Sequence, residues 1–182
     1  MAMTRRDRVR RLFILCNHFL RNLAFYRAGW RRGGIDQEPS LRRKENKFWV
    51  NVNANFIDIC VLEWCKLFGD VNGKHHWSKV VTRQAEFERQ LLQRLRMTHD
   101  QFAAYVKEMR RYRDKFVAHL DDEHIMYLPR FRPAKSSVAF LYHYLLANED
   151  DGDFFPENPP PAWRMYLLWV NTGRNVYDPD TD

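Results

Sequence analysis

The sequence predicts an all-α protein, an up-and-down bundle of four or five helices with a proline-rich C-terminal extension. Apolar residues recur every three or four positions through long segments, which is the spacing of one helix face. Glycine and proline number only 7 and 8 among 182 residues, and so few turn-forming residues disfavour a fold of many short strands. A hydrophobic content of 45% and an aromatic content of 15% exclude a disordered chain.

The first two helices are predicted from Thr4 to Trp30 and from Lys47 to Phe68. Residues 35–46, with a proline and a basic run, form the connection between them. Residues 69–73, which begin and end with glycine, predict a turn after the second helix. The apolar stripe of the first helix, opposite its arginines, consists of Leu12, Leu15, Phe19, Leu23 and Tyr26.

A third helix is predicted within residues 77–97. The fourth begins at Thr98, because Thr98 and Gln101 form a capping box in which each side chain bonds the backbone N–H of the other. It extends to about Leu120, with one apolar stripe of Phe102, Tyr105, Met109, Tyr112, Phe116 and Leu120. A fifth helix is predicted from Ala134 to Ala147.

Residues 1–148 are therefore expected to form the helical bundle, and residues 149–182 an extension of the same domain. The extension begins with an acidic, proline-rich surface segment. Residues 163–169 are apolar enough to dock on the bundle as a short helix, and residues 173–182 are expected to form an acidic tail.

The cysteines and the N-terminal segment favour a cytoplasmic protein. Cys16, Cys60 and Cys65 match neither a disulfide framework nor a zinc-site spacing, and they lie in apolar segments, as expected in a reducing compartment. The arginine-rich start precedes an apolar run, as in a signal peptide, but Asn17 and His18 interrupt the run and no cleavage site follows. No segment approaches the roughly 18 apolar residues of a membrane span, so no membrane association is expected.

The net charge of +7 and the pI of about 9.5 favour an anionic partner such as nucleic acid. A basic housekeeping fold, or a basic surface that meets an acidic protein, explains the charge equally well.

The segment from Arg110 to His119 combines two groups that RNA cleavage needs. The guanidinium of Arg113 can hold a phosphate and stabilise the charge that develops on it. The imidazole of His119 titrates near neutrality, so it can accept the 2′-hydroxyl proton or protonate the leaving oxygen. This chemistry requires neither a metal ion nor a cofactor, and none is predicted.

On a straight α-helix, Arg113 and His119 lie roughly 120° apart, at the two edges of the apolar stripe. Two copies of the helix packed about a two-fold axis would bring both residues into a shared cleft, which predicts a homodimer. A purely structural reading places His119 at the edge of the core and pairs Arg113 with Asp121 or Asp122.

The run Arg113-Asp-Lys-Phe-Val-Ala-His119, followed by Leu-Asp, resembles the signature of the HEPN superfamily, especially its abortive-infection branch. That signature is an arginine, a polar residue, a few further residues and a histidine on a late helix of an all-helical bundle. The aromatic helix that ends in Glu-Trp-Cys-Lys-Leu-Phe-Gly69 is similar to that branch as well. The resemblance covers residues 10–148, and its specific part is about nine residues long.

The resemblance implies a metal-independent ribonuclease that acts as a toxin or antiviral effector and works as a homodimer. It implies that Arg113 and His119 are catalytic and that Asp114 orients them. The proline-rich segment and the helix after it have no counterpart in that pattern.

Basic residues near this segment are candidates for RNA binding. Arg110, Arg111 and Lys115 lie on the polar side of the fourth helix, and the arginines of residues 5–11 form a second basic group. A solvated helix face is the alternative for each group. Adjacent His75 and His76 point in different directions and have no further ligand nearby, which disfavours a metal site.

Two functions are therefore predicted. The first is a homodimeric, metal-independent endoribonuclease that leaves a 2′,3′-cyclic phosphate, with Arg113, Asp114 and His119 at its site. The second is a non-catalytic helical module that binds nucleic acid or a partner protein, such as an antitoxin, in a defence or toxin–antitoxin system. A purely structural interaction protein is a third, weaker interpretation.

Overall fold

Six α-helices make up most of the regular structure in the computed structural model, which describes residues 3–31, 40–117, 128–150 and 155–178. The chain is therefore predominantly α-helical, as predicted. Two short strands, β1 (Trp30–Arg31) and β2 (Ser40–Leu41), pair antiparallel. The helices are α1 (Arg5–Ala28), α2 (Lys47–Trp64), α3 (Gln84–Leu95), α4 (His99–Tyr112), α5 (Phe131–Asn148) and α6 (Ala162–Tyr177).

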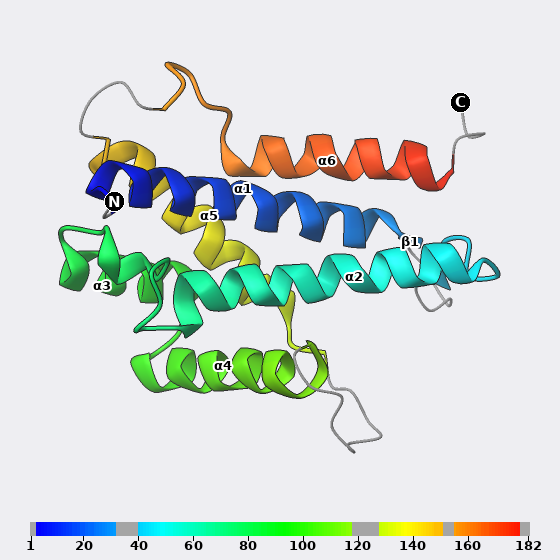
Figure 1. Ribbon diagram of the computed structural model, residues 1–182, viewed down its shortest axis with the longest axis horizontal. Helices are drawn as coiled ribbons and strands as arrows, with labels where there is room; N and C mark the ends of the chain where they lie inside the picture. Colours follow the sequence, from blue (N-terminus) through cyan, green and yellow to red (C-terminus); the bar gives the residue numbers. More distant parts are fainter. Residues whose placement is uncertain (1–2, 32–39, 118–127, 151–154, 179–182) are drawn as a thin grey trace.

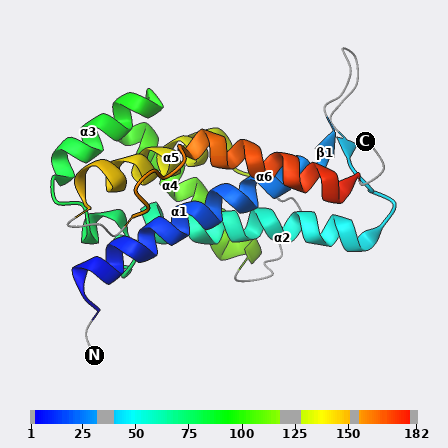
Figure 2. The ribbon, with the colours of Figure 1, turned by 90° about the horizontal axis from the view of Figure 1, so that it is seen from above.

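Helix α1 is the central element, because α2, α5 and α6 all pack against it. In Figure 1, α1 lies between α6 and α2, and α2 runs in the opposite direction to α1. Figure 2 shows that α6 lies along the C-terminal half of α1. The beginning of α1 is fixed by a capping box in which Thr4 and Asp7 each accept a hydrogen bond from the backbone N–H of the other.

Helix α6 is longer than the sequence predicts. Residues 163–169 were expected to form a short helix and residues 173–182 a tail, but α6 continues to Tyr177. Gly173 is buried against α1, where a Cβ atom would lie 2.7 Å from the Cβ of Ala28. The prediction was wrong because this close approach uses a glycine and because a buried tyrosine, Tyr177, ends the helix.

Helix α4 packs against the C-terminal end of α2 through aromatic rings. Trp64 is fully buried and contacts the rings of Phe102 and Tyr105 at centroid distances of 6.3 and 5.3 Å. Its indole N–H donates to the Ser137 hydroxyl of α5 at 2.9 Å. One tryptophan therefore joins α2, α4 and α5, and it holds the first half of α4 in place.

Among the described residues, no helix is both long enough and apolar enough to cross a membrane. The three cysteines are free and buried, in keeping with their prediction as small apolar residues.

Candidate active site around Arg113

The predicted site begins where α4 changes its geometry. The capping box at Thr98 and Gln101 is confirmed, and Tyr105, Met109 and Tyr112 are buried along one face as predicted. After Tyr112 the backbone continues as a π-helical turn, η3 (Arg113–Val117). Such turns are rare and are frequent at functional sites. The angle expected between Arg113 and His119 assumed a regular α-helix, and that assumption is wrong for residues 113–117.

Two carboxylates hold the guanidinium of Arg113. Its Nη1 donates to Asp70 Oδ1 at 2.6 Å, and its Nε donates to Asp114 Oδ1 at 2.8 Å. Burial disfavours the charged form of Arg113, whose side chain is 17% exposed, but the two hydrogen bonds outweigh burial and raise its pKa. The guanidinium is therefore a fixed cation. Within the described part of the chain, Nη2 is its one nitrogen without a hydrogen-bond partner.

Asp70 directly follows a second π-helical turn, η1 (Cys65–Gly69), which continues α2. Its backbone N–H donates to the carbonyl of Cys65 at 2.8 Å, and its own carbonyl accepts from the N–H of Gly73 at 2.7 Å. Both bonds hold Asp70 at the predicted turn between residues 69 and 73. The ion pair with Arg113 thus connects the ends of two helices, each of which finishes in a π-helical turn.

A second contact fixes the same end of α4. The hydroxyl of Tyr112 donates to Asp58 Oδ1 of α2 at 3.1 Å. Burial raises the pKa of Asp58, and the hydrogen bond from Tyr112 opposes that shift. Because Tyr112 precedes Arg113 directly, this bond sets the orientation from which the guanidinium extends toward Asp70.

The structure places some of the other predicted site residues next to Arg113 and leaves one of them undescribed. Asp114 is exposed and contacts Arg113, which brings two of the three predicted catalytic residues together. Arg110 and Arg111 are exposed on the last turn of α4, and Lys115 is half-buried in η3. His119, the third predicted catalytic residue, lies outside the described residues.

The sequence did not reveal Asp70 as a partner of Arg113. The structural interpretation predicts Asp121 or Asp122 as the partner of Arg113, and both lie outside the described residues. The sequence places Asp70 in a predicted turn, but a separation of 43 residues from Arg113 carries no periodic signal that would pair the two. The one local indication of a functional role is that Asp70 is a charged residue just after the end of a predicted helix.

Two described side chains near Arg113 carry groups that could act as a nucleophile or a metal ligand, Cys65 and His76. Burial raises the pKa of the Cys65 thiol to about 12, although Arg113 opposes the shift, so Cys65 is protonated at neutral pH. His76 is buried and accepts a hydrogen bond from the N–H of Ser78, which is a local structural role. Among the described residues, no group of three or more His, Cys, Asp or Glu side chains is placed to hold a metal ion.

Comparisons of this chain with protein-family models, with curated proteins and with solved structures found no match.

Proposed function

We propose that this protein is a metal-independent endoribonuclease whose site contains Arg113, Asp114 and His119. The observation that supports it is the guanidinium of Arg113, which two carboxylates fix at a π-helical turn beside the exposed, basic end of α4. A cation that is already oriented can stabilise charge on a phosphate without the cost of reorganisation.

In the proposed reaction, the 2′-hydroxyl oxygen of RNA attacks the adjacent phosphorus and the bond from phosphorus to O5′ breaks. His119 accepts the 2′-hydroxyl proton while water protonates the leaving O5′, or it protonates O5′ while water accepts the 2′-hydroxyl proton. The products are a 2′,3′-cyclic phosphate and a 5′-hydroxyl. Arg113 supplies Nη2 to a non-bridging phosphate oxygen. Asp114 and Asp70 are positioning residues, since they contact Arg113 rather than the reacting atoms.

The wider assignment belongs to the same proposal. It comprises membership of the HEPN superfamily, the up-and-down bundle of that family, a homodimer that pairs two copies of the site, and a cytoplasmic role as a toxin or abortive-infection effector. Arg110, Arg111 and Lys115 would attract the RNA backbone to the site, which makes binding dependent on salt.

The test is cleavage of a panel of RNAs in the presence of a chelator. The wild type is compared with His119→Ala and Arg113→Gln, and with His99→Ala as the matched control. His99 is exposed on the first turn of α4, at the opposite end of that helix from Arg113. We expect cyclic-phosphate products from the wild type and the control only. Equal cleavage by His119→Ala, or no cleavage by any of the four proteins, would exclude the proposal.

One observation favours a second function. An arginine held by two carboxylates also serves as a structural clamp between α2 and α4. In that case the protein is a non-catalytic module that binds RNA or a partner such as an antitoxin. Salt-sensitive RNA binding that survives His119→Ala, without cleavage of any RNA, is the result that this second function predicts.

A further inference from the structure

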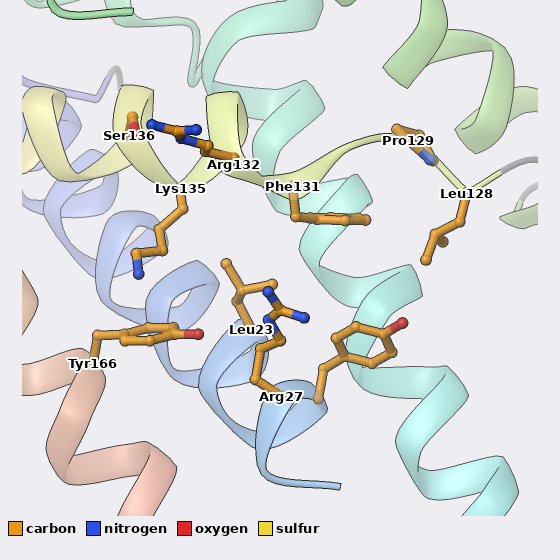
Figure 3. Close-up of a pocket in the computed structure, with 10 residues that line it drawn as sticks. Leu23, Arg27, Leu128, Pro129, Phe131, Arg132, Lys135, Ser136 and Tyr166 are labelled. Carbon is orange, nitrogen blue, oxygen red and sulfur yellow. The ribbon is translucent and has the colours of Figure 1, made fainter. Parts of the chain in front are cut away.

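A separate pocket lies between α1, α5 and α6, and its walls carry cations. Its volume is about 500 Å³, within the usual range for small-molecule sites. Figure 3 shows Arg27 extending into this space from α1, with Lys135 of α5 and Tyr166 of α6 on the facing walls. Arg132 is part of the lining too, but it extends along α5 toward Ser136.

Among the described residues, the cations of this pocket have no anionic partner. None of the described residues that line it carries a carboxylate, and neither Arg27 nor Lys135 forms an ion pair with a described residue. The ammonium of Lys135 lies over the ring of Tyr166, 3.9 Å from its centroid. Burial lowers the pKa of Lys135, and repulsion from Arg27 lowers it further. A bound anion would relieve that repulsion.

The first turn of α5 adds a second source of positive potential. Phe131 and Arg132, the first two residues of this helix, line the pocket. The N-cap residue, Arg130, makes no side-chain hydrogen bond to the first backbone N–H groups. An 18-residue helix thus presents the positive end of its dipole beside two cations, an arrangement that favours phosphate.

Two aromatic rings form part of the remaining walls, together with Leu23, Leu128 and Pro129. Phe131 and Tyr26 lie side by side, with ring centroids 6.5 Å apart, and both line the pocket. Flat rings next to cations suit a ligand that combines a phosphate with a planar base. The volume is also far larger than a lone phosphate needs.

We propose that this pocket binds a nucleoside monophosphate, with the phosphate at Arg27 and Lys135 and the base against Phe131 and Tyr26. The nucleotide is either free or the 5′ end of an RNA, since both present the same chemistry. The inference is independent of the proposed ribonuclease site, because it uses none of its residues.

A neighbouring hollow bears on the choice between these two sources. It measures about 420 Å³, shares Lys135, Ser136 and Tyr166 with the first pocket, and adds Arg94 and Trp163. The side chain of Trp163 is exposed, and Arg94 supplies another cation. This hollow offers space, charge and a stacking surface for a second nucleotide of the same strand.

The experiment is titration calorimetry of the full chain with the four ribonucleoside monophosphates, the four matching nucleosides and inorganic phosphate. Two further arms use a five-nucleotide RNA with a 5′-phosphate and the same RNA with a 5′-hydroxyl. Arg27→Gln and Lys135→Gln are compared with the exposed controls Arg89→Gln on α3 and Lys107→Gln on α4. Thermal unfolding verifies that every variant folds.

We expect at least one monophosphate, or the 5′-phosphorylated RNA, to bind more tightly than its partner without phosphate. Arg27→Gln and Lys135→Gln should each weaken that binding about tenfold or more, and the controls should leave it within about twofold. If the 5′-phosphorylated RNA binds and no monophosphate does, the natural ligand is the 5′ end of an RNA. If a monophosphate binds, the natural ligand is the free nucleotide. The proposal is overturned if no ligand binds, if phosphate adds no affinity, if inorganic phosphate binds as tightly as the nucleotides, or if the controls weaken binding equally.

Discussion

Arg113 and Asp70 form an ion pair of 2.6 Å between Nη1 and Oδ1, and this pair joins the π-helical turn after α4 to the one after α2. A π-helical turn contains one residue more than an α-helical turn, so it rotates the side chains that follow it. Each turn therefore contributes to the direction in which its charged residue points. The pair fixes a guanidinium that stays charged throughout the physiological pH range.

We predict that Asp70→Asn lowers the rate of RNA cleavage by about ten- to a hundredfold, because a misplaced guanidinium stabilises the transition state less well. Initial rates on a fixed RNA substrate measure the effect. The value of kcat should fall more than KM rises, since Asp70 acts through Arg113. The matched control is Glu108→Gln, an exposed carboxylate on α4 that should change neither value. An unchanged kcat for Asp70→Asn would show that Asp70 does not position Arg113.

Stability should depend on pH through Glu63, which is buried between α1 and α2. Burial raises its pKa from 4.5 to about 7, while hydrogen bonding to Asn22 and the charges of Lys66 and Arg21 oppose the shift. His18 lies 3.5 Å away, and burial lowers its pKa. A raised carboxyl pKa stabilises the fold fully below pH 4.5, and this contribution is lost as the pH rises through 7.

We predict that Glu63→Gln removes this dependence. A pKa shift of this size corresponds to about 3 kcal/mol, so the variant should gain up to that amount over the wild type between pH 4.5 and 8. Urea unfolding at several pH values measures the difference, with the exposed Glu45→Gln as the control. A constant difference between Glu63→Gln and the wild type would rule out the raised pKa.

Gly173 should tolerate no side chain, because its position faces the Cβ of Ala28 at 2.7 Å and a ring carbon of Phe25 at 3.1 Å. Neither a backbone-anchored Cβ nor a packed ring can move aside cheaply. Gly173→Val should therefore lower the free energy of unfolding by about 1–3 kcal/mol. Asn175→Ala, at an exposed position of the same helix, should stay within about 0.5 kcal/mol of the wild type in urea unfolding.

Glu149 should be a stabilising anion, since it is 1% exposed and holds three segments together. It accepts hydrogen bonds from the backbone N–H and the hydroxyl of Thr82, at 2.9 and 3.1 Å, and it pairs with Arg5 at 2.5 Å. Glu149→Gln keeps the volume but loses the charge. We predict a loss of about 1–3 kcal/mol in urea unfolding, and no measurable loss for the exposed Glu157→Gln.

The helices could be predicted because their signals are local. The apolar spacing of residues 12–26 and the capping box at Thr98 act within a few turns, and both appear in the structure. The extent of α6 could not be predicted, since the burial of Gly173 and Tyr177 depends on α1, far away in the sequence. The polar composition of residues 173–182, taken by itself, indicates a tail.

In the candidate site, too, the contact between neighbouring residues could be predicted and the contacts between distant segments could not. The contact between Arg113 and Asp114 joins adjacent residues and was expected from the motif. The contact with Asp70 depends on two π-helical turns, which no residue pattern announces, and on the packing of α4 against α2. The pocket at Arg27 and Lys135 draws on three helices, so no single segment of the sequence carries its pattern.

The packing of α6 on α1 has a consequence for synthesis on the ribosome. Phe25 of α1 contacts Trp169 of α6, with ring centroids 5.8 Å apart, and Ala28 faces Gly173. The nascent chain carries this surface of α1 uncovered until α6 has emerged, and such surfaces attract chaperones or other nascent chains. Efficient expression of shortened versions that lack α6 should therefore require a chaperone that shields the C-terminal half of α1.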